Sequence, residues 1–242
     1  MSEYDLLAAW FRIADWAAYD LAKDGAEAVI LMPLGRLPRT AAFIARHAFT
    51  SSNYRHRKLA ASLAGWVQQP PPDLLTEFLQ QEADRDQRLP IEDIRRLESQ
   101  SVVEDIVFSA AFWARSENFR PSAVQLLRDV VERTLAGEYW NTSAYALTTL
   151  CHHQSPGCDE LLMRFKDFSV NAKINHPSRP SLTQEKQFAQ NLASKNPKTL
   201  QAIESVLERR QEAARIAVLD DTGRTAIDDY LHVAERFEAA AA

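Results

Sequence analysis

Two cysteines and two histidines lie close together in the segment Cys151-His152-His153-Gln154-Ser155-Pro156-Gly157-Cys158. Thiolate sulfur and imidazole nitrogen are the donors of structural zinc sites, so this segment contains the ligand types of a tetrahedral site. The spacing opposes such a site, because adjacent histidines point to different sides of a helix and no CxxC or HxxxH pair is present. We therefore expect no metal ion here and interpret Cys151 as a buried core thiol. An enzyme or metalloprotein with a Cys/His site at 151–158 stays an alternative.

Opposite charges are separated along the chain. Residues 28–72 include six basic side chains and no acidic one, whereas residues 73–105 include ten acidic side chains and four arginines. Such blocks either pair with each other or face different partners. Because basic side chains gather at one expected helix start, we predict that Arg55, Arg57 and Lys58 contact a partner protein with an acidic surface.

Nucleic acid is the alternative ligand of the basic segment 36–58. A local excess of positive charge is what phosphate binding needs. The formal net charge of the whole chain is -5, however, which opposes non-specific attraction to nucleic acid. A protein partner is therefore the favoured hypothesis.

Tyr139 and Trp140 stand in an expected turn at 137–141. Aromatic side chains that repeat at helical spacing are usually buried in the core, whereas aromatic side chains in a turn are buried less often. We predict that this pair is a partner-binding anchor.

The common catalytic motifs are absent from the sequence. It contains no P-loop, nucleophile elbow, HExxH motif or glycine-rich dinucleotide turn. Neighbouring acids such as Glu104 and Asp105 lie on polar segments, where solvated charge is the usual state. We expect no catalytic residue and no cofactor.

The elements that position these residues are expected to be helices. Glycines are few and lie mostly at expected turns, and runs of alternating β-branched and aromatic residues are missing, so the fold class is all-α. Residues 102–158 should form three helices separated by the turns 117–121 and 137–141. Further helices are expected at about 4–23, 39–49, 54–68, 73–84, 91–98, 159–168, 183–194, 197–218 and 225–240, with a short apolar segment at 26–32.

Three of these helices share a core of small residues, in Leu59–Ala64, Phe108–Trp113 and Tyr145–Leu150. Each is followed by a turn and a leucine-rich helix. At these residues the chain resembles HEAT-like α-solenoids, in which small side chains let neighbouring helices approach closely. The resemblance implies a right-handed α-α superhelix of antiparallel helix pairs.

The resemblance covers about residues 39–168, and we expect the whole chain, 1–242, to form a single domain. It would consist of an N-terminal cap helix and linker at 1–38, HEAT-like repeats at 39–169 and C-terminal helices at 170–242. HEAT-like proteins of this size in bacteria include adaptors and immunity proteins. The implied function is non-enzymatic binding of another protein by the curved face, as an adaptor, scaffold or inhibitor.

Membrane insertion and export are not indicated. The first residues, 1–5, are acidic where a secretory signal would be basic, and no apolar run reaches the length of a membrane span. The chain has only two cysteines, and one of them lies in a helical stretch. This is more typical of a protein from a reducing compartment than of one held together by disulfides. We expect a cytoplasmic protein without a membrane partner.

Overall fold

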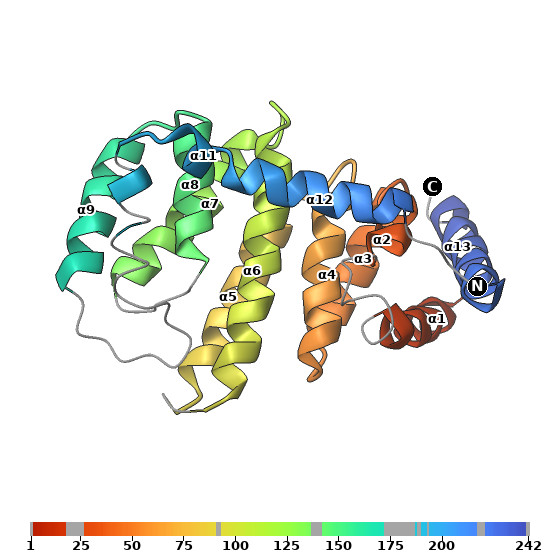
Figure 1. Cartoon of the computed structure of the whole chain (residues 1–242). Helices are drawn as coiled ribbons and strands as arrows, with labels where there is room; N and C mark the ends of the chain where they lie inside the picture. The colour runs from red at the N-terminus through yellow and green to blue at the C-terminus, as the bar shows by residue number, and fades with distance from the viewer. Residues whose placement is uncertain are drawn as a thin grey trace. The chain divides into compact units, whose positions relative to one another are not determined.

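The structure is a computed structural model that describes residues 2–17, 27–90, 93–136, 142–171, 187, 190–192, 194–216 and 221–240. Within these ranges every regular element is a helix and none is a strand, which confirms the all-α prediction. The helices, labelled as in Figure 1, are α1 Glu3–Trp16, α2 Ala28–Leu34, α3 Pro38–Phe49, α4 Tyr54–Trp66, α5 Leu74–Gln87, α6 Arg95–Ala114, α7 Arg120–Leu135, α8 Ser143–His152, α9 Cys158–Asn171, α11 Pro197–Leu200, α12 Ala202–Ile216 and α13 Asp221–Ala240.

The chain divides into two compact units. Unit 1 contains Met1–Phe78 and Leu207–Ala242, and unit 2 contains Leu79–Val206. These boundaries differ from the divisions expected after residues 38 and 169, because the last helix packs with the first ones. That the units form one solenoid domain stays a prediction.

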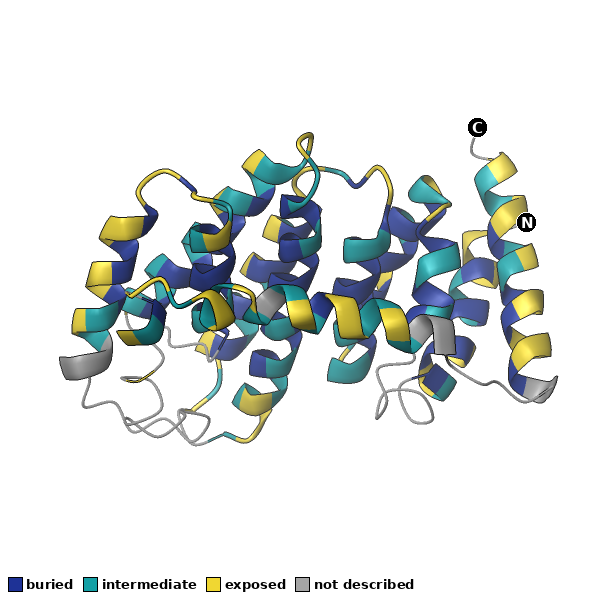
Figure 2. Ribbon diagram, turned by 45° about the horizontal axis from the view of Figure 1, so that its top comes forward, coloured by how far each residue is buried: buried dark blue, intermediate teal, exposed yellow. Residues whose placement is uncertain are grey.

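In unit 1 the two ends of the chain pack together. Helix α13 contacts α1, α2 and α3, and α3 packs along α4 (Figure 1). The packed side of α13 carries Ile227, Tyr230 and Ala234, whose spacing places them on one face of the helix, while exposed residues occupy the other side (Figure 2). The ring centroid of Tyr230 lies 6.0 Å from that of Trp10 in α1. Local periodicity does not reveal such a pairing.

Several helices begin where a polar side chain satisfies a free backbone N–H group. Ser2 and Asp5 form a capping box at α1. The side chain of Asn53 accepts a hydrogen bond from the backbone N–H of Arg55 at 3.0 Å, which confirms the cap expected at 50–53. Asn196 caps α11 in the same way.

In unit 2 the helices α6, α7, α8 and α9 pack on one another in sequence. Helix α7 contacts α6, α8 and α9, and α8 also contacts α6 and α9. Ala110 and Ala111 of α6 and Ala146 of α8 are buried, as the pattern of small residues predicted. Their short side chains leave room for aromatic packing, and the ring centroids of Phe108 and Tyr145 are 5.4 Å apart.

Helix α6 is longer than the sequence indicated. One helix was expected at 91–98 and another from about 102, but a single helix runs from Arg95 to Ala114. The expected break, at 99–101, contains neither Gly nor Pro, and its side chains are used in packing. Ser99 is 2% exposed and donates a hydrogen bond to Glu82 Oε1 at 2.8 Å.

Part of the acidic segment is buried, which corrects the expectation that its charges are solvated. Glu82, Asp86 and Asp105 are all less than one tenth exposed. The Asp86 carboxylate pairs with Arg96 at 3.3 Å. Burial of an ionised carboxylate requires such partners, because its desolvation is costly.

The helix expected at 197–218 is interrupted at Gln201. Helix α11 packs against α8, and α12 then starts at Ala202. This places Glu204, in the first turn of α12, beside the C-terminal end of α8.

Candidate functional site

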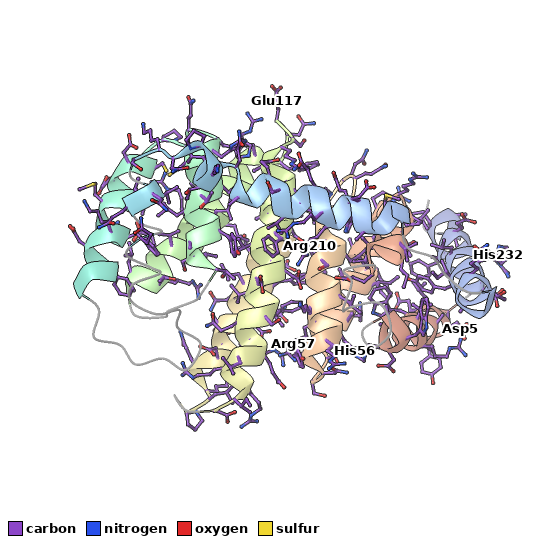
Figure 3. All side chains as sticks on the ribbon, viewed as in Figure 1. Asp5, His56, Arg57, Glu117, Arg210 and His232 are labelled. Atoms are coloured by element: carbon purple, nitrogen blue, oxygen red, sulfur yellow. The ribbon has the colours of Figure 1, made fainter. Side chains whose placement is uncertain are left out.

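Arg57 was predicted to contact a partner; that role stays a prediction, and the structure shows an internal role for the side chain. The side chain lies in the first turn of α4 (Figure 3), and the residue is 5% exposed. Its Nη1 donates hydrogen bonds to the carbonyl oxygens of Ser51 and Ser52, both at 3.0 Å. These carbonyls follow the end of α3 and lack helical partners. Arg57 therefore closes the turn between α3 and α4 and does not present its charge to solvent.

Arg55 and Lys58 are half-buried in the same helix turn. Arg55 Nε donates a weak hydrogen bond to the Tyr54 hydroxyl at 3.4 Å, and its guanidinium lies 5.9 Å from the Tyr54 ring centroid. Partner binding by Arg55 and Lys58 stays a prediction.

His56, in the first turn of α4, contacts side chains of α1. The residue is 8% exposed, and its Nε2 lies 2.6 Å from Asp15 Oδ1. The Phe11 ring packs against the imidazole with a centroid distance of 5.2 Å. This histidine thus serves packing between α1 and α4 in unit 1.

Opposite charges from the two blocks pair within unit 1. Arg46 of the basic segment lies 3.0 Å from Glu77 and 3.4 Å from Asp73 of the acidic segment. Hydrogen bonding to Glu77 raises the pKa of Arg46. At this position the blocks neutralise each other, as one of the two sequence hypotheses proposed.

Tyr139 and Trp140 lie outside the described residues. Their predicted role as a binding anchor stays a prediction.

The two cysteines meet at the connection between α8 and α9. Cys151 is half-buried in the last turn of α8, and Cys158 is buried at the first position of α9. The turn between them reverses tightly, with a positive φ at Gln154 and at Gly157. The thiols hydrogen-bond to each other, which together with burial raises the pKa of Cys151, while the same bond lowers the pKa of Cys158.

The histidines of this segment group with an acid that the sequence did not indicate. Among the described residues, the potential metal donors of His152, His153 and Glu204 lie within 4.8 Å of one another. Glu204 comes from α12, so no local motif connects it with the histidines. The alternative weighed from the sequence, a site built from both cysteines and both histidines, is not found among the described residues.

Arg115, which directly follows the last residue of α6, holds the Glu204 carboxylate in place. Its Nη2 lies 2.5 Å from Glu204 Oε2, and the other carboxylate oxygen, Oε1, lies 3.9 Å from His152 Nε2. The pKa of His153 is lowered by burial and by the charges of His152, Arg120 and Arg115, although Glu204 opposes this effect. A lowered pKa favours the neutral imidazole over the charged one.

A cavity of 620 Å³ adjoins this group in unit 2. His152 and both cysteines contribute to one wall, and Leu192, Lys195 and Leu200 contribute to another. Its size suits a small molecule, and thiol, imidazole and ammonium groups provide polar contacts.

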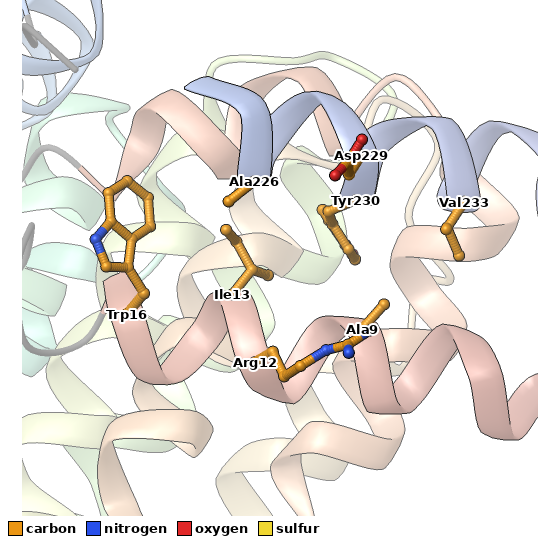
Figure 4. Close-up of a pocket in the computed structure, with 8 residues that line it drawn as sticks. All are labelled: Ala9, Arg12, Ile13, Trp16, Ala226, Asp229, Tyr230 and Val233. Carbon is orange, nitrogen blue, oxygen red and sulfur yellow. The ribbon is translucent and has the colours of Figure 1, made fainter. Parts of the chain in front are cut away.

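A smaller cavity of 320 Å³ lies between α1 and α13 in unit 1 (Figure 4). Ile13, Trp16 and Val233 make most of its wall apolar, and Arg12 and Asp229 add charges. Tyr230 also lines it, and burial raises the pKa of its hydroxyl well above the usual range. No pair of groups in this wall has the arrangement of a nucleophile and a base.

Comparison of the chain with protein families, with characterised proteins and with solved structures found no match. Within the described ranges, no helix has both the length and the apolar composition needed to cross a membrane.

Proposed function

We propose that the protein is a non-enzymatic module that binds another protein, as an adaptor, scaffold or inhibitor. The fold proposed for this role is a HEAT-like superhelix of antiparallel helix pairs. It is supported by the sequential packing of α6, α7, α8 and α9, and by the buried small residues of α6 and α8.

The observation that carries the proposal is an exposed apolar pair at the start of α6. Ile94 is 73% exposed and Leu97 is 40% exposed. Residues three apart lie on the same helix face, so their side chains form one apolar surface. Full burial of an exposed Ile or Leu contributes roughly 1.5–3 kcal/mol, and the part of each side chain still exposed would contribute its share of this on binding. Single exposed apolar residues need no explanation, but an adjacent pair on one face is a candidate anchor.

Charges around this pair define the partner that fits it. Arg95 is largely exposed although it pairs with Asp93 at 2.6 Å, and Arg88 is exposed in the preceding turn. A partner with an apolar pocket and an acidic rim would bury Ile94 and Leu97 and complement the arginines. This surface agrees with the acidic partner expected from the sequence.

Nucleic-acid binding by segment 36–58 has less support. Arg46 pairs with acids and Arg57 is buried, so two of the six positive charges of this segment serve internal contacts. No observation in the described residues favours a phosphate backbone over a protein surface.

Affinity capture from native lysate with the tagged full chain, at low and at moderate salt, tests the proposal. We compare the double variant Ile94→Asp/Leu97→Asp with Met163→Asp, which changes an exposed methionine elsewhere in unit 2. One stoichiometric protein should be retained by wild type and by Met163→Asp, and lost by the double variant at an unchanged melting temperature. Recovery of nucleic acid alone, or equal recovery by all three proteins, would contradict the proposal.

A further inference from the structure

We propose that His152, His153 and Glu204 bind a divalent transition-metal ion of the zinc type. This inference goes beyond protein binding, and it departs from the sequence expectation that no metal ion binds. The donors are also not the four Cys and His residues that the sequence brought together.

The distances fit one ion. Zinc bonds to imidazole nitrogen and carboxylate oxygen are about 2.0–2.2 Å long, so two donors at the tetrahedral angle of one ion lie about 3.4 Å apart. His152 Nε2 and Glu204 Oε1 are 3.9 Å apart. All donor atoms of the group lie within 4.8 Å of one another, so side-chain movements of about 1 Å would bring them to one ion.

Two donor atoms of the group are buried without a partner. His153 Nε2 and Glu204 Oε1 make no hydrogen bond to any described residue, and neither is accessible to solvent. A buried polar atom without a partner is unfavourable, and native proteins rarely contain two of them side by side. A metal ion between them would satisfy both atoms at once.

The surrounding elements hold the donors in place. His152 ends α8 and His153 caps it, where the free carbonyl groups of a helix C-terminus favour positive charge. Arg115 fixes Glu204 through the second carboxylate oxygen and leaves Oε1 directed to the histidines. Hydrogen bonds of this kind to a ligating carboxylate orient it for the metal.

Two arginine charges near the site oppose binding of a cation, and the ligand types restrict which metal ion can bind. Arg115 and Arg120 both act on His153, and Glu204 supplies the negative charge of the group. Hard cations such as Mg²⁺ and Ca²⁺ need several oxygen ligands, whereas imidazole suits zinc, copper, nickel and cobalt. Three protein ligands also leave one coordination position open. Because His152 lines the 620 Å³ cavity, a molecule in that cavity would lie close to the ion.

The test is titration of the full, untagged chain with Co²⁺, followed by visible absorption spectroscopy. Cobalt bound by nitrogen and oxygen gives d–d bands, and cobalt bound by thiolate adds a sulfur charge-transfer band. We expect saturable binding of one equivalent with d–d bands alone. His153→Ala and Glu204→Gln should weaken binding by at least the roughly 10–100-fold that loss of an outer-shell partner costs. Added Zn²⁺ should displace the cobalt and raise the melting temperature of wild type.

Matched controls separate this site from its neighbours. Cys151→Ser/Cys158→Ser changes the thiols, and His232→Ala removes an exposed histidine of α13 (Figure 3); both should bind cobalt like wild type. If Glu204→Gln lowers the helix content, the half-exposed His152→Ala variant gives the answer instead. The proposal is overturned by a sulfur charge-transfer band, by binding that survives loss of His152 or His153, or by the lack of saturable binding.

Discussion

The Glu238 carboxylate accepts hydrogen bonds from both the backbone N–H and the hydroxyl of Thr40, each at 2.7 Å. Thr40 lies in the first turn of α3 and Glu238 lies near the end of α13. Helix α3 begins with Pro38 and has no side-chain cap of its own. Glu238 also accepts from the backbone N–H of Arg39 at 3.3 Å. A carboxylate from the last helix therefore caps the third helix.

Glu238→Ala should destabilise unit 1 by about 1–2 kcal/mol, the usual cost of losing an N-cap. The free N–H groups of α3 lose their acceptor, and the helix dipole loses a favourable charge. Chemical denaturation measures the effect, with the exposed Glu235→Ala in the same helix as the control. Equal stability of the two variants would show that the contact contributes nothing.

Arg57→Ala should lower the free energy of unfolding by about 2–3 kcal/mol, because two carbonyl groups lose a charged donor. Arg55→Ala, one residue away and half-buried, should cost about 0.5 kcal/mol or less. Thermal melting of both variants provides the comparison. If Arg57→Ala melts like wild type, the side chain is not structural and its predicted role in partner binding regains support.

Gly35→Ala should destabilise unit 1 by about 3 kcal/mol or more, as overpacking does when backbone must move. A Cβ atom on Gly35 would stand 2.1 Å from the carbonyl oxygen of Trp66. The two segments are further joined by a hydrogen bond from the backbone N–H of Gln68 to the Gly35 carbonyl at 3.0 Å. Arg36→Ala, at the exposed next position, is the control in urea unfolding. A loss no larger than that of Arg36→Ala would mean that α4 shifts freely.

Tyr230→Phe should leave unit 1 as stable as wild type, or more stable by about 1 kcal/mol, at neutral pH. The Tyr230 hydroxyl is buried and makes no hydrogen bond to described residues, so its removal relieves a desolvation cost. Unfolding in denaturant measures this difference, and a marked loss of stability would reveal a partner of the hydroxyl.

The same substitution should alter the response to alkaline pH. Burial raises the pKa of Tyr230, so above the ordinary tyrosine value of about 10 the unfolded chain loses this proton while the folded chain keeps it. Below about pH 10 the tyrosine is protonated in both states, so ionisation costs no stability. Above this pH the free energy of unfolding falls until the pH reaches the pKa of Tyr230 in the folded chain. Wild type should therefore lose more stability than Tyr230→Phe between about pH 8 and pH 11. Parallel curves would contradict the raised pKa.

The approximate positions of most described helices could be predicted from neighbouring residues in the sequence. The same holds for caps formed by a residue directly before its helix. Asn53 stands immediately before α4, so both the cap and the start of the helix were visible in the sequence. The single helix α6 was missed because polar residues at 99–101 were expected to end it. Burial against Glu82 keeps Ser99 helical, and that contact joins segments separated in the chain.

The partners of charged side chains were decided by the tertiary structure. Arg57 looked like a surface charge, because nothing in its own helix indicates that it reaches back to Ser51 and Ser52. From the sequence, His152 and His153 were considered as ligands only together with the two cysteines. Glu204, which the structure places beside them, lies in a helix whose position depends on the packing of α11 against α8.

The sequence by itself determined the all-α class, the small-residue helix faces and the local caps, because these depend on periodicity and on neighbours a few residues away. Only the tertiary structure decided that Glu238 caps α3 and that Glu204 joins His152 and His153. These contacts form when separate helices pack apolar faces together, and the polar groups at the edges of those faces then meet. Burial of apolar surface determines how the helices pack, and this packing determines which polar groups distant in the sequence come into contact.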